Sequence, residues 1–499
     1  MASLGDSIRS GTKWLFAGNI AGQALQFVFG VVLARLLVPA DFGMIVTIRV
    51  FTGFAGMVMS GGMGQSLIRA KEADENDFNA VFTMQLAVSI LVYLTFYFTA
   101  PMIAAFFDNS LYTELVRIST LVFLLRPFSL MYNAWLSREM NFKTRSMVGL
   151  LTGGVTGISG IAMAWFGLGV WSLILSGLIG ALFSNLLLGR ILPIRLKIKP
   201  DLASLRKHSA YGFKVVLNNF LGYLTKESKN LVLSKVAGPA FLGLFNKGES
   251  LSRMPNQMIM PSTMQPVFRA MSKVQDDLDQ TKYMLYRAIT LLTTYTLPFY
   301  IGAWWVAEPF IGSVYGAKWL PSADAMRILV LSGLFFNITY PCGVVLDAQN
   351  KLKQELVVQI IQLAIVISAC IIGLEWGLRG VAWGILFGNI FGAFATYYLV
   401  YRTLHTQVRE LISALTPGLI LGSLFFIVLA VTHFALGETI TSAPMLYLTG
   451  MTASGASFYA TAFLLIPIPA LRTEAARWRG QLHNIAKTIR KIVVESFKH

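Results

Sequence analysis

Residues 211–268 read YGFKVVLNNFLGYLTKESKNLVLSKVAGPAFLGLFNKGESLSRMPNQMIMPSTMQPVF. At about 20 residues per bilayer crossing, this stretch is long enough to cross a membrane twice. It is too polar for two ordinary spans, because it carries Lys226, Glu227, Lys229, Glu249 and Arg253. A charge near the centre of a membrane helix costs about 2.5–3.5 kcal/mol. Facing a water-filled cavity would lower that cost, so the pattern predicts that both segments line a polar chamber.

The composition places this chamber in a polytopic membrane protein. The chain is 55% hydrophobic and 13% charged, with a mean hydropathy of +0.63, whereas soluble domains carry about 25% charged residues. Arg9 and Lys13 lead into an apolar run at 14–37 that is too long for the core of a cleavable signal peptide. Cys342 and Cys370 lie in apolar runs, so the sequence predicts no disulfide, metal site or cofactor.

The apolar runs predict an all-α protein with about fourteen transmembrane helices. The candidate spans are 14–37, 42–68, 78–107, 116–136, 147–166, 170–188, 211–232, 241–268, 284–311, 325–346, 356–374, 380–401, 411–434 and 444–466. Alternate loops then differ sharply in basic residues, and the poorer side holds only Arg35, Arg117, Lys235, Lys318 and Arg379. The positive-inside rule therefore predicts that both termini are cytoplasmic. The formal net charge of +17 reflects this topology, and nucleic-acid binding is not expected.

The seventh span repeats the first at an offset of 200 residues. Asn19, Gly22, Val32, Leu33, Pro39, Ala40 and Gly43 have identical counterparts at 219, 222, 232, 233, 239, 240 and 243. Six spans separate the copies, so both halves would enter the membrane in the same direction. Such parallel repeats place a substrate site between the halves. A chance match of two apolar helices is the alternative, because small residues recur in membrane helices.

These patterns predict two six-helix lobes, two further helices and a tail. The predicted parts are an N-terminal lobe at 1–190, a basic cytoplasmic linker at 191–209, a C-terminal lobe at 210–403, spans thirteen and fourteen at 404–468, and a tail at 469–499. In the tail, Trp478, Leu482, Ile485, Ile489, Val493 and Phe497 share a helical face. We expect this basic amphipathic helix to lie on the inner leaflet; a soluble partner is the alternative.

Sites for enzymatic chemistry are not apparent. The dipeptide Gly-Lys does not occur, which excludes a Walker phosphate loop, and the five histidines are scattered. The predicted outer loops are short, whereas a membrane polymerase or ligase would need a large catalytic one. The sequence thus predicts a transporter rather than an enzyme.

The intramembrane polar residues are the candidate site. The predicted cavity cations are Arg49, Lys226, Lys229, Lys247 and Arg253; the predicted polar lining is Asn19, Gln23, Gln26, Asn219, Asn246 and Asn256; Glu227 and Glu249 are candidates for ion coupling. A surplus of cations suits an anion, above all a phosphate. Alternatively, Glu249 pairs with Arg253 and Glu227 with a lysine, which would neutralise them. Arg126, next to Pro127, is expected to snorkel or to stabilise a kink.

Several motifs also resemble bacterial polysaccharide flippases of the multidrug/oligosaccharidyl-lipid/polysaccharide superfamily, in the colanic- and teichuronic-acid exporter branch. They are GTKW at 11–14, VLAR at 32–35, FG at 42–43, QSLI at 65–68, REMNF at 138–142, KVQDD at 273–277 and YGAKW at 315–319. The match covers roughly residues 5 to 410. These motifs lie mostly in loops and at helix ends, so no site residue is carried over from the family.

The resemblance implies two six-helix lobes, a central cationic cavity and alternating access. It also implies a substrate, an undecaprenyl-diphosphate-linked oligosaccharide that moves from the cytoplasmic to the outer leaflet during surface polysaccharide assembly. Coupling to protons or sodium ions, and contacts with other polysaccharide-assembly proteins, are left open. The alternative is a drug or cation antiporter of the same superfamily, which would be expected to have surplus carboxylates.

Overall fold

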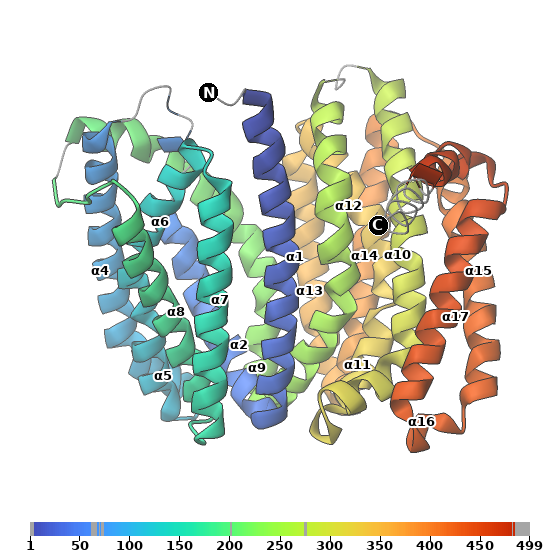
Figure 1. Ribbon diagram of the computed structural model, residues 1–499, viewed down its shortest axis with the longest axis horizontal. Coiled ribbons are helices and arrows are strands. Elements are labelled where there is room, and N and C mark those ends of the chain that lie inside the picture. Colours follow the sequence, from blue (N-terminus) through green and yellow to red (C-terminus); the bar gives the residue numbers. More distant parts are fainter. Residues whose placement is uncertain are drawn as a thin grey trace, which may run out of the picture. The chain divides into compact units, whose positions relative to one another are not determined.

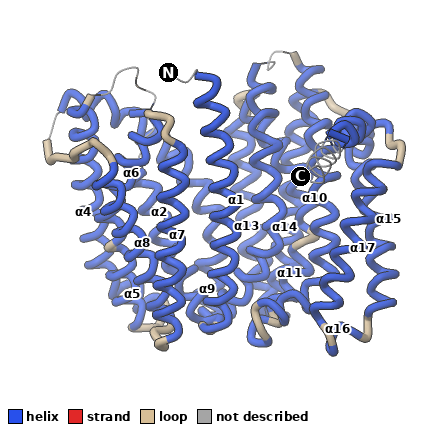
Figure 2. Tube along the Cα trace, viewed as in Figure 1, coloured by secondary structure: helices blue, strands red, loops and turns tan. Residues whose placement is uncertain are grey.

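The computed structural model describes residues 4–60, 67–68, 70, 74–199, 202–273, 277–481 and 483–484. Across these residues every regular element is a helix, and Figure 2 shows no strand among them. The predicted all-α class is therefore confirmed. The described chain forms two compact units, Met1–Asn246 and Lys247–His499, which we call unit 1 and unit 2. The predicted lobe boundaries remain predictions.

Unit 1 begins with two long helices and their neighbours (Figure 1). Its elements are α1 (Leu4–Leu36), α2 (Pro39–Ser60), α4 (Glu75–Phe106), α5 (Leu111–Thr120), α6 (Val122–Arg138), α7 (Phe142–Trp165), α8 (Val170–Ile191) and the first part of α9 (Leu202–Lys273). Helix α7 packs between α1 and α8, and α4 packs on α5 and α6. Buried aromatic and aliphatic side chains such as Phe78, Phe123 and Leu115 fill the spaces between them.

Unit 2 contains the end of α9 and the helices that follow. They are α10 (Leu278–Val314), η1 (Ala317–Trp319), α11 (Ser322–Leu329), α12 (Ser332–Ala348), α13 (Leu352–Gly373), η2 (Leu374–Trp376), α14 (Gly377–Leu404), α15 (Val408–Leu436), α16 (Thr439–Ser442), α17 (Pro444–Leu465) and η3 (Pro469–Leu471). Helix α10 packs on α12, α15 and α17, while α14 packs on α12 and α13. The last two long helices are thus anchored on α10.

Many of these helices can span a membrane. Within the described residues, 8 helices are long and apolar enough to do so, or up to 10 if each of two bent pairs is one span. Even the apolar faces of these helices are largely exposed, as expected for side chains that face lipid. The chain is accordingly a multi-pass membrane protein, and the count of fourteen spans remains a prediction.

Helix α9 is a run of 72 residues that breaks at Gly238. Gly238 has φ 81°, which a residue without a side chain adopts readily, so the break falls between the predicted seventh and eighth spans. The turn at this break packs against the turn between α1 and α2. A Cβ added to Gly43 would overlap the carbonyl oxygen of Pro239, and one added to Gly243 would overlap that of Pro39.

This contact is reciprocal, because each glycine of one repeat copy meets the proline carbonyl of the other. A local twofold relation between two equivalent segments produces such an exchange of contacts. Small residues at the crossing let the two backbones approach closely. The 200-residue offset seen in the sequence thus corresponds to a packing relation within unit 1.

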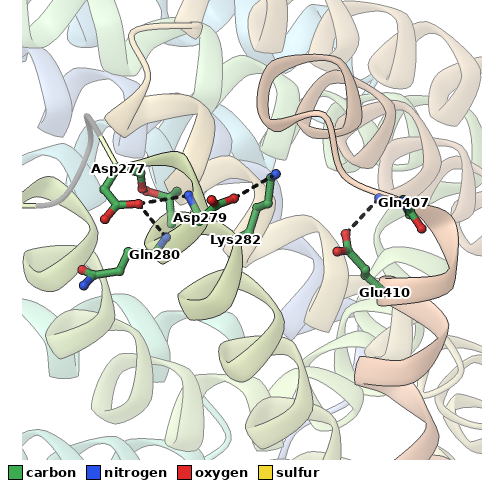
Figure 3. A network of polar contacts seen from close by, with 7 residues as sticks. Asp277, Asp279, Gln280, Lys282, Gln407 and Glu410 are labelled. Atoms are coloured by element: carbon green, nitrogen blue, oxygen red, sulfur yellow. Dashed lines mark hydrogen bonds and ion pairs between the residues drawn. The ribbon is translucent and has the colours of Figure 1, made fainter.

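Asp side chains cap the N-termini of two helices, α4 and α10. Asp74 accepts a hydrogen bond from the backbone N–H of Asp77 at 2.8 Å and begins α4. That bond lowers the pKa of the Asp74 carboxyl below its usual value. Asp277 begins α10 by accepting from the N–H groups of Asp279 and Gln280, as Figure 3 shows. In the same view, the Glu410 side chain accepts from the N–H of Gln407 at the start of α15.

The chain turns sharply after α17. The helical segment Pro469–Gln481 bends by 95° from it, so it leaves the direction of the preceding span. Leu471 and Ala475 are buried against α15 and α17, and Arg287 of α10 forms a salt bridge with Glu474 at 3.0 Å. Trp478 is 45% exposed. This start agrees with an interfacial helix; the predicted apolar face from Leu482 onward lies largely outside the described residues.

Candidate anion-binding site

Arg49 is the best-placed of the predicted cations. It lies ten residues into α2, about 15 Å from the start of that helix at 1.5 Å per residue. Its side chain is exposed although it lies deep among the helices of unit 1. Within the described part of the chain, the guanidinium group makes no ion pair or hydrogen bond. An unpaired cation in a membrane span needs water or an anion beside it.

Helix α9 brings Tyr223 and Glu227 to Arg49. The Tyr223 hydroxyl lies 2.8 Å from the carbonyl oxygen of Arg49 and 2.7 Å from that of Val50. Its ring lies over Gly53, where any side chain would overlap the hydroxyl. The negative charge of Glu227 acts on Arg49, and the Glu227 carboxylate accepts a hydrogen bond from Asn230 at 2.7 Å. One face of α2 therefore meets a polar stretch of α9.

Lys229 and Asn230, which follow on α9, are buried. The structure thus places Lys229 in the protein interior rather than on an open wall. The side chains of Lys226 and Asn219 lie outside the described residues, so their predicted roles remain predictions. On α1, the predicted lining residues Asn19, Gln23 and Gln26 are exposed.

Arg126 of α6 approaches the same face of α2. A Cβ added to Gly56 would overlap the guanidinium group of Arg126, which therefore rests directly on the bare backbone of α2. Arg126 is exposed, and it makes no ion pair or hydrogen bond with the residues that the structure describes. Sequence reasoning noted this residue but assigned it to snorkelling or a kink. Its position near a glycine of another helix was not visible in the sequence.

In unit 2, the structure shows the predicted alternative in which Glu249 pairs with Arg253. Glu249 and Arg253 form a salt bridge at 2.8 Å across one helical turn of α9, and Glu249 is 6% exposed. The Arg253 guanidinium also lies 5.2 Å from the centre of the Phe336 ring. Both residues border a small pocket of about 10 Å³, room for about one water molecule. Its other lining residues are Ser252, Leu329, Ser332, Gly333, Phe336, Ile385 and Asn389.

Two further predicted residues of unit 2 also have local partners. The Lys247 ammonium lies 4.6 Å from the centre of the Tyr315 ring and 4.8 Å from that of Trp319. These aromatic rings can stabilise a cation through their negative faces. Asn256 accepts a hydrogen bond from the hydroxyl of Tyr300. Asn246, the last residue of unit 1, is half-buried.

The structure thus groups Arg49 with Glu227 in unit 1 and Glu249 with Arg253 in unit 2. Sequence reasoning missed Tyr223, Gly53 and Gly56, and Tyr223 looks like an ordinary interfacial aromatic residue. Gly53 follows Arg49 by four residues, and Gly56 follows Gly53 by three. This spacing could have indicated that all three lie on one face of the helix. Across the described residues, no group of three His, Cys, Asp or Glu side chains is placed to hold a metal ion.

Comparison with known proteins decides the family. The family described as "Polysaccharide biosynthesis protein" matches residues 32–324, more than half of the chain. The chain belongs to this family. The resemblance to polysaccharide exporters of the multidrug/oligosaccharidyl-lipid/polysaccharide superfamily is thereby confirmed.

Two relatives of this family member have names that describe polysaccharide assembly. The lipopolysaccharide biosynthesis protein WzxC of Escherichia coli is 22% identical over 422 residues, covering 83% of this chain and 85% of WzxC. The succinoglycan biosynthesis transport protein ExoT of Rhizobium meliloti is 23% identical over 485 residues, covering 92% of this chain and 93% of ExoT.

Solved structures show the same fold. The lipid II flippase MurJ, in an inward closed conformation, matches with a TM-score of 0.71 and 16% identity, over 89% of this chain and 96% of MurJ. An inward-facing multidrug transporter of the MATE family matches with a TM-score of 0.61 and 15% identity, over 77% of this chain and 94% of that protein. This member of the polysaccharide biosynthesis family therefore has a MurJ- and MATE-like fold.

Proposed function

We propose that this protein is a flippase that moves a polyprenyl-diphosphate-linked oligosaccharide from the cytoplasmic to the outer leaflet. The membership in a polysaccharide biosynthesis family and the transport function in the name of ExoT support this substrate class. The observation that carries the proposal is Arg49. Its exposed guanidinium lies within a membrane span and forms no ion pair among the described residues, although the charge of Glu227 acts on it, so its N–H donors suit a diphosphate.

The proposed topology has fourteen spans, as two six-helix lobes and two further helices, with both termini in the cytoplasm of a bacterium and the protein in its inner membrane. A diphosphate cannot cross about 30 Å of hydrocarbon unaided, because its charges would lose their hydration. In the proposal, cavity cations bind the diphosphate while the polyprenyl tail stays in the bilayer. Rocking of the lobes then exposes the site to the other side.

An inside-negative membrane potential favours this direction of movement. Outward transfer of negative charge gains about 2.3 kcal/mol per charge per 100 mV. Exchange of protons or sodium ions at Glu227 or Glu249 is the alternative source of energy. Measuring flipping in vesicles with a potential but no ion gradient separates the two.

The test of the proposed function is removal of the Arg49 charge. In cells that depend on this protein, Arg49→Gln is expected to lower surface polysaccharide more than about tenfold, and Arg49→Lys less, because only Arg can bind a phosphate through two parallel hydrogen bonds. The lipid-linked oligosaccharide should accumulate. The matched control is Arg117→Gln, since the Arg117 side chain is held by the Tyr97 carbonyl and ring. Normal export by a well-inserted Arg49→Gln protein would refute the proposal.

The alternative, a drug or cation antiporter, is addressed by the same variants. The fold alone does not separate the two functions, because the MATE-family structure shares it. An antiporter would bind a cation, so removing Arg49 should preserve or strengthen its transport. Drug resistance conferred by the wild-type chain and retained by Arg49→Gln would favour the antiporter.

A further inference from the structure

We propose that Arg126 is a second anion-binding residue of the transport path, held over Gly56 of α2 and aligned with Arg49 along one face of that helix. This inference rests on the proposed function and extends its site from one cation to two. The geometry comes entirely from unit 1. Arg126 lies outside all of the sequence motifs that resemble the family.

The first step is the face of α2. Arg49, Gly53 and Gly56 follow one another at steps of four and three, so they lie on one side of the helix. Tyr223 occupies the space that a side chain at Gly53 would fill, and the guanidinium of Arg126 occupies the corresponding space at Gly56. The two arginines therefore border the same strip of α2, about two helical turns or roughly 10 Å apart.

The second step is the depth of Arg126. It lies in the span Leu111–Arg138, 15 residues from one end and 12 from the other. At 1.5 Å per residue, these are distances of roughly 20 Å. An arginine side chain is shorter than these distances, which argues against snorkelling. The charged group must therefore meet water or an anion inside the protein.

The third step is the chemistry of the group. The Arg126 guanidinium is exposed, and it has no ion pair or hydrogen bond within the ranges that the structure describes. Its Nη1 atom lies against the backbone of Gly56, and its N–H donors have no partner among the described residues. A guanidinium in this state binds phosphate oxygens through two parallel hydrogen bonds. Two such groups in line along α2 form two successive positions for a diphosphate, one at Arg49 and one at Arg126.

The order of these positions follows from the proposed topology. Helix α2 begins at Pro39 on the outer side in that topology, so Gly56 and Arg126 lie nearer the cytoplasm than Arg49. A headgroup entering from the cytoplasm would reach Arg126 first and Arg49 second. Between these two positions the diphosphate would pass the Tyr223 hydroxyl, which lies over Gly53.

The experiment uses the purified full chain in detergent, with undecaprenyl diphosphate and the neutral alcohol undecaprenol as probes. Arg126→Gln is expected to weaken binding of the diphosphate about tenfold or more and to leave binding of the alcohol within about twofold. Arg126→Lys should give a smaller loss. The affinity of the wild type for the diphosphate should fall more steeply with salt than that of Arg126→Gln, because one charge contact is lost.

A second variant tests the position rather than the charge. Gly56→Ala keeps Arg126 but fills the space its guanidinium occupies, and alanine favours the helix over glycine. Binding of the diphosphate should weaken about threefold or more. The matched control is Gly177→Ala of α8, where an added Cβ meets nothing within 4 Å, and its binding should stay at the wild-type level.

The outcomes separate this inference from the proposed function. If Arg49→Gln weakens diphosphate binding but Arg126→Gln, Arg126→Lys and Gly56→Ala do not, Arg126 is a packing residue and only this inference fails. If neither arginine affects the diphosphate, the proposed function loses its site as well. Equal losses for the diphosphate and the alcohol would assign Arg126 to structure, and they too would overturn the inference.

Discussion

Equivalent turns of the two repeat copies handle charge in opposite ways. On α2 of unit 1, the positions are Arg49, Gly53 and Gly56; on α9, 200 residues later, they are Glu249, Arg253 and Asn256. The arginine of the first copy is exposed and has no ion pair among the described residues, whereas Arg253 is locked to a buried glutamate at 2.8 Å. At these equivalent positions, unit 1 has one arginine without an ion pair among the described residues, and unit 2 has an arginine paired with a glutamate.

The difference shows that counting charges does not locate an anion site. In a buried ion pair, the Coulomb attraction is largely offset by the cost of desolvating both charges, and the paired groups are not available to bind a ligand. An unpaired guanidinium in an accessible position keeps its donors for a phosphate. Of the predicted cations, Arg49 therefore fits the substrate role best, while Arg253 and Lys247 have partners within the protein.

The largest expected effect comes from breaking the pair in unit 2. Glu249→Gln leaves Arg253 without its carboxylate. Because Glu249 is buried but the Arg253 side chain is 33% exposed, this loss should cost about 1.5–3 kcal/mol. The thermal unfolding temperature in detergent should drop clearly. Glu249→Gln combined with Arg253→Gln should cost less than the two single changes added together, because neither charge remains unpaired.

Arg49→Gln is the matched control for this stability measurement. Since the Arg49 guanidinium has no ion pair within the described ranges, its loss should change the unfolding temperature little although it lowers surface polysaccharide strongly. If Arg49→Gln destabilises the protein as much as Glu249→Gln does, the contrast between the two units is wrong. Arg49 would then have a structural partner.

A middle-sized effect tests the equivalence of the two copies. Gly43→Ala and Gly243→Ala each push a methyl group into a proline carbonyl of the other copy, and overpacking of this kind costs about 1–3 kcal/mol. Because the contact is reciprocal, the two variants should lower the unfolding temperature by similar amounts. Gly149→Ala, where nothing lies within 4 Å of the added Cβ, is the control. Strongly unequal effects would mean that the local twofold relation does not hold in solution.

The sequence was sufficient for the helical class, the membrane location and the family, because these depend on long apolar runs and on motifs. It also located the repeat, since Gly43 and Gly243 have the same neighbours in both copies. It could not decide between free and paired cations. Glu249 and Arg253 stand one turn apart, but so do many residues that do not bond, and the pairing depends on rotamers and burial.

Arg126 shows a second limit of sequence reasoning. Its neighbour Pro127 suggested a local explanation, a kink, whereas its partner in space is Gly56, 70 positions earlier in the chain. No local pattern connects a glycine on one helix with an arginine on another. Packing between α2 and α6 had to be known first.

The smallest effect concerns the caps of two helices, one in each unit. Asp74→Ala and Asp277→Ala remove acceptors for backbone N–H groups at the starts of α4 and α10, at a cost of about 0.5–1 kcal/mol each. Asp74→Asn keeps an acceptor but no longer titrates. Because the pKa of folded Asp74 is lowered, its ionised form adds stability above the ordinary Asp pKa, and this is lost as the pH falls through the lowered value. The advantage of the wild type over Asp74→Asn in unfolding temperature should therefore be present at pH 6 and shrink below about pH 4. An advantage that persists unchanged at pH 3 would mean that the cap acts through its geometry alone, without the charge.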